Sequence, residues 1–371
     1  MEVCSAKENA KVAGEKKKLF RRRKYVCSDT KCGCVCACVT ITAILIMIMI
    51  LSSWAQTFSA KKFTNVEYEA NGIKLHAYLA KPASPKNNTP AVIIFHTWSG
   101  ISEVATYFAD RLAEEGYYAI APDLFRGVAS KSNNIIANIL MVLFTPQGNI
   151  DQDAEAAWEY VKSLPNVDKD RIASGPGFCF GGSQSLIFAS RHSVAATVTC
   201  YGTYITELDE SGSEAWGKLK SGGPVLGIYG QEDTRPKPDE AKQFAAALKV
   251  NKIDHNVTIY EGVGHGFITP ESYKDSNHEH HQTTKTAWNQ IEGFLRRAFD
   301  KSNGVSRRSL SARENTEAKP YKVPLDVSLY HRFSCALKCS QDYFTHTGHW
   351  NAENLEPHAS VQNVDFDKKQ V

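Results

Sequence analysis

One cysteine of the sequence lies where a nucleophile would be expected, between glycines and at the junction of a predicted strand and a predicted helix. The stretch Gly177-Phe178-Cys179-Phe180-Gly181 has the G-x-nucleophile-x-G spacing of a nucleophile elbow, with cysteine in place of serine. The elbow needs small flanking residues because the chain turns so sharply that larger side chains would clash. A helix start also favours the thiolate through its dipole. The pattern predicts a nucleophilic Cys179; a small buried thiol is the alternative.

Two later loops offer the partners that such a nucleophile needs. After the predicted strand PVLGIYG come Glu232 and Asp233, and after NVTIYEG comes His265 between glycines. An acid and then a histidine, each following a strand, is the chain order of partners expected after an elbow. His265 would take the thiol proton and later activate water, while Asp233 would hold the imidazole tautomer. Taken alone His265 would more often be structural, but the ordered set favours a triad.

The same pattern places an oxyanion hole. One backbone N–H should come from Phe180, directly after the nucleophile, and a second from Trp98 or a neighbour, in the loop after the strand AVIIFHT. The run His278 to His281 (HEHH) has a spacing that suits no common metal site, so a solvated loop is expected. The sequence therefore predicts no metal site.

Alternating strand-like and helix-like segments surround these residues. A hairpin around Asn-Gly begins the series and a long amphipathic helix ends it. Strands that alternate with helices of ten or more residues predict a mostly parallel sheet covered on both faces. The expected strands are at 66–82 (two), 91–97, 117–125, 171–179, 195–203, 224–230 and 256–262, and the expected helices at 102–116, 153–164, 181–191, 239–249 and 283–300.

An apolar segment without acidic residues runs from Ser130 to Gly148. One interpretation is a buried helix. The other is a cap over the active site, because the segment follows the C-terminal end of a strand, where α/β sheets bind ligands.

The N-terminus carries most of the positive charge. Residues 1–34 hold ten Lys/Arg and four Asp/Glu, a balance of +6, so the rest of the +3 chain sums to −3. The globular part therefore gives no indication of nucleic-acid binding.

Residues 35–54 are uncharged and long enough to cross a bilayer as a helix, and the basic residues before them predict a cytosolic N-terminus and a lumenal or extracellular body. We expect a transmembrane signal anchor; a cleaved signal peptide is the alternative.

Several residues suggest modification. The cysteines at the cytosolic edge of the predicted span are candidates for palmitoylation, with a small apolar role as the alternative; they are Cys27, Cys32, Cys34, Cys36 and Cys38. Asn87 and Asn256 stand in glycosylation tripeptides, which matter if the body is lumenal. Residues 301–371 are predicted to be a polar, partly disordered extension, following a catalytic domain at 60–300.

The motifs GFCFGG, HTWSG, GYYAIAPDLF, GQED and GHGF together resemble the dienelactone hydrolase family over roughly residues 64–300. The resemblance implies one α/β-hydrolase domain that cleaves small esters or lactones without a cofactor, here preceded by one N-terminal transmembrane helix. It implies Cys179 as nucleophile, Asp233 as acid and His265 as base. The expected substrate-pocket side chains are His96, Thr97, Phe267 and Tyr201.

The sequence also departs from that family. Thr97 stands where its best-known members have a glutamate near the resting cysteine, and Thr269 stands where they have a substrate-binding arginine. Between Ser130 and Gly148 only Lys131 is basic, so a neutral ester is favoured over an anionic dienelactone. Pro176 is unusual in a central strand because it lacks a ladder donor.

Two functions from different classes follow. The first is a membrane-anchored ester or lactone hydrolase with a small-molecule substrate. The second is a catalytically weak scaffold that serves as a membrane-tethered binding protein, which the missing glutamate and arginines would favour. A transferase with the same acyl-enzyme chemistry is a third, and the oligomeric state is left open.

Overall fold

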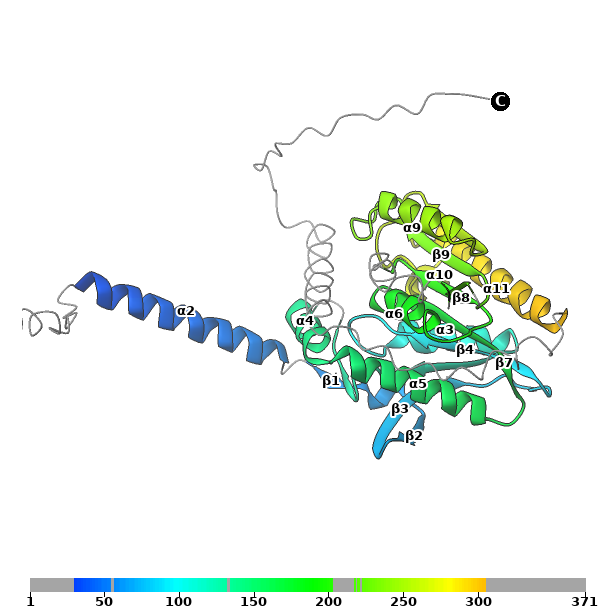
Figure 1. The fold of residues 1–371 in the computed structure, drawn as a ribbon. Coiled ribbons are helices and arrows are strands. Elements are labelled where there is room, and N and C mark those ends of the chain that lie inside the picture. Colours follow the sequence, from blue (N-terminus) through cyan, green and yellow to red (C-terminus); the bar gives the residue numbers. More distant parts are fainter. Residues whose placement is uncertain are drawn as a thin grey trace, which may run out of the picture. The chain divides into compact units, whose positions relative to one another are not determined.

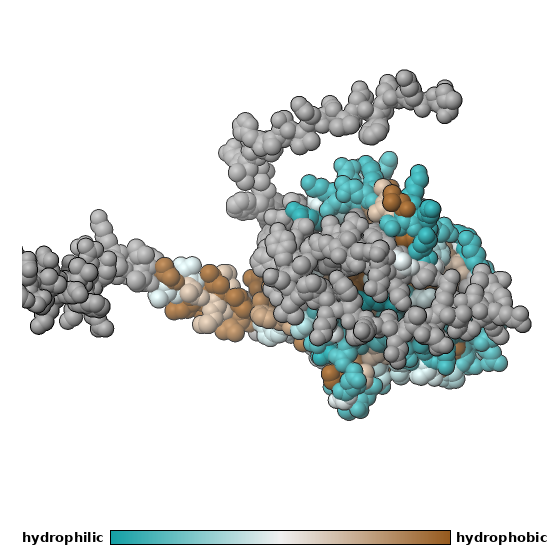
Figure 2. Space-filling view, viewed as in Figure 1, coloured by the Kyte–Doolittle hydropathy of each residue, from teal (hydrophilic) through white to brown (hydrophobic). Residues whose placement is uncertain are grey.

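The computed structural model describes residues 30–54, 57–131, 134–202, 217, 219–220 and 222–304. The chain divides into two compact units, residues 1–52 and residues 53–371. Residues Thr30–Trp54 form helix α2, nearly all of which belongs to the first unit, and its side chains from Val39 to Ser52 are exposed and mostly apolar (brown in Figure 2).

The predicted membrane span at residues 35–54 coincides with most of α2. Within the described part of the chain, however, no helix combines the length and the apolar character that a bilayer crossing requires. The structure therefore does not support this part of the expected architecture. Of the palmitoylation candidates, Cys27 lies outside the described residues, and Cys32, Cys34, Cys36 and Cys38 belong to α2.

The second unit is built on an eight-stranded sheet in the order β10-β9-β8-β7-β4-β5-β3-β2 (Figure 1). The strands from β10 to β5 are parallel, while β3 is antiparallel to β5 and β2 to β3. This is the predicted α/β-hydrolase arrangement with a mostly parallel sheet. The strands are β2 (Val66–Ala70), β3 (Ile73–Ala80), β4 (Thr89–Phe95), β5 (Tyr118–Pro122), β7 (Val167–Phe178), β8 (Thr197–Cys200), β9 (Val225–Gly230) and β10 (His255–Tyr260).

The expected hairpin is present between β2 and β3. Asn71 (φ 53°) and Gly72 (φ 75°) form the two-residue turn, with positive φ at both positions as a type I′ turn requires. A two-stranded sheet not expected from the sequence pairs β1 (Phe58–Ser59) with β6 (Val128–Ala129).

Helices cover both faces of the large sheet. They are α3 (Glu103–Glu114), α4 (Ile135–Phe144), α5 (Gln147–Ser163), α6 (Phe180–Ala189), α9 (Pro238–Val250), α10 (Pro270–Lys274) and α11 (His281–Gly304), with a 3₁₀ helix at Ala60–Phe63. The last helix takes in residues 301–304 of the predicted extension, and residues 305–371 lie outside the described part.

The end of β7 shows how the two faces are used. Side chains of successive strand residues point to opposite faces. A Cβ on Gly177 would collide with α6, whereas the ring of the next residue, Phe178, lies 5.5 Å from that of Phe108 in α3. Phe108 in turn lies 4.2 Å from Trp288 in α11. The sheet therefore has α6 on one face, and α3 with α11 on the other.

Pro176 lies in an irregular part of β7. The pairing of β7 with β8 shifts register between Ser174 and Gly177, so the proline occupies a bulge rather than a continuous ladder. A bulge is where a strand tolerates a residue without an N–H. This irregularity reconciles Pro176 with a central strand.

Helix α4 meets neither sequence interpretation completely. Ala137, Met141 and Val142 are buried, but Ile136 is 38% exposed and Phe144 is 73% exposed, so the helix is buried on one face only. A role as a cap over the active site stays a prediction.

The contrast between two glycines tests the packing of the sheet. We expect Gly181→Ala to destabilise the fold by more than about 3 kcal/mol, because its Cβ would lie 2.0 Å from the Phe95 carbonyl oxygen and backbone cannot yield as a side-chain end can. Gly148→Ala, in α5 with no atom within 4 Å, should instead stabilise by about 0.5–1 kcal/mol. Urea unfolding measures both. Equal effects would contradict the packing described here.

Candidate active site

The candidate nucleophile lies at a strained turn between β7 and α6. Phe178 ends the strand, Phe180 begins the helix, and Cys179 between them has φ 57° and ψ −114°. A positive φ is unusual for a residue with a side chain and costs on the order of 1–3 kcal/mol. Hydrogen bonds hold the turn: the Cys179 N–H donates to the Cys200 carbonyl (3.0 Å), and its carbonyl accepts from the Gly182 N–H (2.9 Å). The backbone geometry is that of the predicted elbow.

The glycines of the motif allow this turn by direct backbone contact. A Cβ on Gly177 would lie 2.0 Å from the Gly181 carbonyl oxygen, and one on Gly182 would lie 2.8 Å from that of Cys200. Real Cβ atoms do not approach backbone so closely, so these positions accept no side chain. The glycine spacing read from the sequence therefore has a steric cause.

The two cysteines of the body differ in surroundings. Cys200 is fully buried at the end of β8, and burial raises the pKa of its thiol. Cys179 is also largely buried, but it lies at a helix start beside His265. Burial without a charged partner keeps a thiol protonated and inert. Cys200 therefore has the properties of a structural thiol, and Cys179 has those of a reactive one.

The acid loop after β9 offered two carboxylates, and the structure separates them. Asp233 is buried, and its Oδ2 lies 3.0 Å from His265 Nδ1, while its Oδ1 accepts a 2.7 Å hydrogen bond from the Arg235 N–H. Glu232 is exposed. The buried carboxylate is therefore the one that can orient the histidine.

The acid loop and the histidine loop are joined through their backbones. The Glu232 N–H donates to the Val263 carbonyl (3.0 Å). A Cβ on Gly230 would lie 2.3 Å from that same carbonyl oxygen, so the close approach depends on glycine at the end of β9. Gly230 was not among the predicted site residues; a glycine closing a buried strand ahead of a functional loop is the signal for it.

His265 has two acidic neighbours, Cys179 and Asp233. Burial lowers its pKa, but a negatively charged Cys179 and the hydrogen bond and charge of Asp233 outweigh burial, so the pKa is raised well above its usual value. Nδ1 of His265 bonds Asp233, whereas Nε2 is buried and has no hydrogen-bond partner among the described residues. Nε2 is therefore the ring nitrogen left for Cys179. The arrangement favours a thiolate–imidazolium pair.

Two of the predicted pocket residues pack around this histidine. The ring of Tyr201 meets that of His265 edge to face at 5.1 Å, and Phe267 lies 6.0 Å from Tyr201. Both are buried, and the Phe267 carbonyl accepts hydrogen bonds from Ser272 and Thr284. These side chains form an aromatic support for the base.

The loop after β4 makes a tight turn. The Gly100 N–H donates to the Thr97 carbonyl (3.2 Å), and the Thr97 hydroxyl shares a 2.8 Å hydrogen bond with that of Ser99. Trp98, the predicted second donor of the oxyanion hole, is the residue after Thr97 in this turn, and its side chain is buried. The hydroxyl that replaces the family glutamate is thus engaged within its own turn.

His96 differs from its prediction. It was expected to line the substrate pocket, but it is 1% exposed, and both ring nitrogens are engaged by the backbone. The Leu124 N–H donates to Nε2 (3.1 Å), and Nδ1 lies 2.7 Å from the Thr97 carbonyl. With only neutral partners, burial lowers its pKa to about 4. The structure does not support a direct contact between His96 and a substrate.

A family model described as the dienelactone hydrolase family matches residues 75–299. The chain belongs to the dienelactone hydrolase family. It is accordingly a hydrolase of carboxylic esters or lactones.

Individual proteins show the same relationship. A "Putative carboxymethylenebutenolidase" of Aquifex aeolicus is 29% identical over 209 residues, which cover 55% of this chain and 86% of that protein. One of Saccharolobus solfataricus with the same name is 30% identical over 269 residues, covering 62% and 96%. A solved Klebsiella pneumoniae structure, a "Putative Dienelactone Hydrolase", has a TM-score of 0.51 and 24% identity, covering 64% of this chain and 98% of that one. That last likeness shows the fold.

The position that carries a substrate-binding arginine in well-known dienelactone hydrolases has a different role here. Thr269 is the N-cap of α10, where its hydroxyl accepts from the Ser272 N–H (3.1 Å). Its side chain therefore serves the helix rather than a substrate carboxylate.

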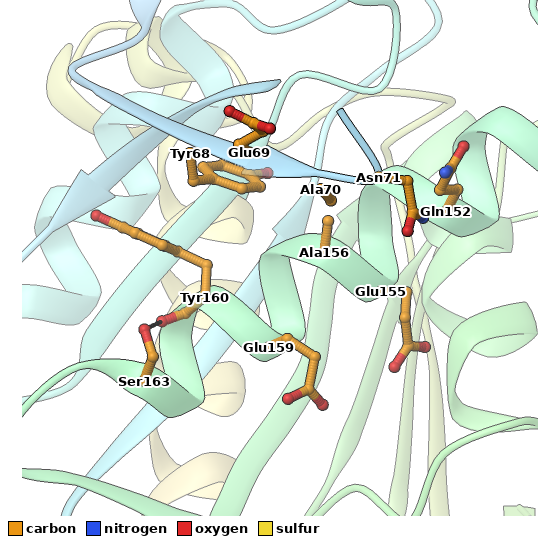
Figure 3. Close-up of a pocket in the computed structure, with 10 residues that line it drawn as sticks. All are labelled: Tyr68, Glu69, Ala70, Asn71, Gln152, Glu155, Ala156, Glu159, Tyr160 and Ser163. Atoms are coloured by element: carbon orange, nitrogen blue, oxygen red, sulfur yellow. Dashed lines mark hydrogen bonds between the residues drawn. The ribbon is translucent and has the colours of Figure 1, made fainter. Parts of the chain in front are cut away.

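Figure 3 shows a pocket of about 440 Å³ that contains none of the predicted site residues. It lies between the β2–β3 hairpin and α5 and includes the stacked rings of Tyr68 and Tyr160 (4.8 Å). Two of its carboxylates are paired, Glu155 with His192 and Glu159 with Lys162. Within the described residues, no three His, Cys, Asp or Glu side chains gather as they would to hold a metal ion.

The charge pairing of Cys179 and His265 predicts an unusual pH profile for alkylation. Asp233 stabilises the imidazolium, so it also stabilises the thiolate paired with it. We expect wild-type Cys179 to react with iodoacetamide at pH values below the usual thiol range, and Asp233→Asn to shift the rise in rate to higher pH. Glu232→Gln, at the exposed neighbouring carboxylate, is the matched control and should leave the profile unchanged. A profile unaffected by Asp233→Asn would contradict the pairing.

Proposed function

We propose that this protein cleaves its ester or lactone substrate through a Cys179-His265-Asp233 triad and a covalent acyl-enzyme. The observation that carries the proposal is the 3.0 Å contact between the buried Asp233 and His265, with Cys179 held at a strained elbow beside the imidazole. These are the three groups that nucleophilic catalysis needs, in mutual reach.

Each group has a defined task. The Cys179 sulfur attacks the carbonyl carbon, and the carbonyl oxygen takes the negative charge, next to the N–H groups of Phe180 and Trp98. The intermediate collapses as the C–O bond breaks and His265 gives its proton to the leaving alkoxide. His265 then takes a proton from water, which attacks the thioester and releases the acid. Asp233 keeps the imidazole oriented throughout.

The surroundings support a small neutral substrate. The ring of Tyr201 lies against His265 and that of Phe267 lies against Tyr201, while Thr97 and Thr269 use their hydroxyls within local structure. No arginine stands at the place where family members bind a carboxylate. An uncharged ester or lactone is therefore the substrate class that we propose.

Cys179→Ala should lower kcat/KM for p-nitrophenyl acetate by about 10³-fold or more, because no other group can form the acyl-enzyme. Asp233→Asn should lower it by about 10²-fold or more, and Glu232→Gln by less than twofold. Stopped-flow release of p-nitrophenol and mass spectrometry of the acetylated Cys179 peptide provide the measurements. A Cys179→Ala variant as active as wild type would overturn the triad. If neither wild type nor Cys179→Ala hydrolyses the ester, the alternative function as a membrane-tethered binding scaffold is favoured.

We further propose that residues 35–54 tether the protein to a membrane, with the N-terminus cytosolic and the catalytic domain lumenal or extracellular. The support is the sequence alone: the absence of charge from Cys32 to Ala60 and the basic stretch before it. Asn87 and Asn256 are both exposed, as glycosylation in that compartment would require.

Fractionation tests the tether. The 371-residue chain should resist alkaline carbonate extraction, and deletion of 35–54 should release it. Glycosidase treatment should change its mobility, and Asn87→Gln and Asn256→Gln should each remove part of that change. Extraction of the intact chain by carbonate would rule out the tether. If the protein carries no glycan, protease digestion of intact vesicles decides the orientation: a lumenal catalytic domain should resist protease added from the cytosolic side.

A further inference from the structure

We infer that His96 is a positioning residue for the oxyanion hole: it aims the Trp98 N–H by holding the preceding carbonyl and supports the residue that carries the second N–H. The inference rests on the acyl transfer at Cys179 proposed above. It concerns a side chain that does not itself touch the substrate.

The tautomer of His96 follows from its partners. The Leu124 N–H can only donate, so Nε2 accepts at 3.1 Å and carries no proton. In a neutral imidazole the proton then resides on Nδ1, which donates to the Thr97 carbonyl at 2.7 Å. Because the ring is almost completely buried, both hydrogen bonds are sheltered from water. The ring orientation is therefore fixed by two backbone groups from different loops.

Holding the Thr97 carbonyl also directs the next N–H. The peptide unit from Thr97 to Trp98 is planar, and in a trans peptide the C=O and the N–H point in opposite directions. With its carbonyl drawn to His96 and to the Gly100 N–H, this unit presents the Trp98 N–H away from both. The turn from Thr97 to Gly100 does not use that N–H, which leaves it for an oxyanion.

The ring of His96 supports the other donor as well. It stacks on the ring of Phe180 with centroids 6.2 Å apart, and Phe125 lies edge-on at 5.0 Å. Phe180 is the first residue of α6, so its N–H has no partner within the helix. One buried side chain thus contacts the peptide of one predicted donor and the side chain of the other.

Two substitutions separate the hydrogen bonds. In His96→Asn, the side-chain amide nitrogen lies the same number of bonds from the backbone as Nδ1 of the histidine, so it can still donate to the Thr97 carbonyl. This variant has no atom at the level of Nε2 and therefore loses the hydrogen bond from the Leu124 N–H. In His96→Gln the amide oxygen reaches the level of Nε2, so it can accept from Leu124 and loses the donor. Because each variant loses one hydrogen bond to the backbone, the two should lose similar amounts of folding stability.

The readout compares reactions with and without an oxyanion. Acylation by p-nitrophenyl acetate forms one, whereas iodoacetamide alkylation forms an S–C bond as iodide leaves and never charges an oxygen. We expect His96→Gln to slow acylation by about 10- to 100-fold through kcat, and His96→Asn by less than about fivefold. In both variants, KM and the rate of alkylation should stay within twofold of wild type, and the pH dependence of alkylation should not change. The inference would be overturned if the alkylation rate of His96→Gln fell as much as its acylation rate, or if the two variants acylated at the same rate.

A trifluoromethyl ketone keeps the test independent of turnover. Cys179 adds to the carbonyl of 1,1,1-trifluoroacetone to give a thiohemiketal whose oxygen is an oxyanion, observable by ¹⁹F NMR of the 371-residue chain. His96→Gln should weaken this adduct by about tenfold or more, and His96→Asn much less. Wild type that forms the adduct but hydrolyses no ester would refute the proposed hydrolysis and leave this comparison intact. Wild type that forms no adduct would refute the oxyanion hole and the role of His96.

Discussion

Backbone contact at the elbow is the constraint on which the rest of the site depends. The end of β4, the turn at Cys179 and the start of α6 meet so closely that a Cβ on Gly181 would lie 2.0 Å from the Phe95 carbonyl oxygen and 2.5 Å from that of His96. Contact between main chains leaves no flexible side chain to absorb a displacement. Cys179 and the loop that carries Trp98 are therefore placed relative to each other by the sheet itself. The strain at Cys179 is held by the strands on either side rather than by local hydrogen bonds alone.

Asp233 and His265 are joined to this frame by a second backbone contact, between the loops that follow β9 and β10. Those strands are parallel neighbours paired residue by residue from Val225 with His255 to Gly230 with Tyr260, so their loops leave the sheet at the same level. Gly230 lets the two loops touch. The carboxylate of Asp233 can then stay buried because a backbone N–H and an imidazole share its charge.

The part of the site that could be predicted from the sequence consists of residues whose role depends on their immediate neighbours in the chain. Cys179, Asp233 and His265 each follow a strand and stand in chain order, and the glycines mark a steric requirement within a few residues. The hairpin at Asn71 and Gly72 was equally local. The roles of His96 and Gly230 depend on contacts between segments far apart in sequence, Leu124 with His96 and Val263 with Gly230, and no spacing records them. The half-buried α4 was ambiguous because its apolar residues continue around the helix.

The two histidines near the elbow show that the neighbours of an imidazole, and not burial alone, decide which protonation state is favoured. Burial alone lowers the pKa of both. His96 meets only neutral backbone groups, so its pKa falls to about 4 and it is an uncharged ring at neutral pH, with one fixed donor and one fixed acceptor. His265 lies between a carboxylate and a thiol, and their charges reverse the effect of burial, so it can hold a proton and release it to a leaving group. In the mechanism that we propose, the same side chain serves geometry at one position and proton transfer at the other, because the fold gives it neutral partners in one place and acidic partners in the other.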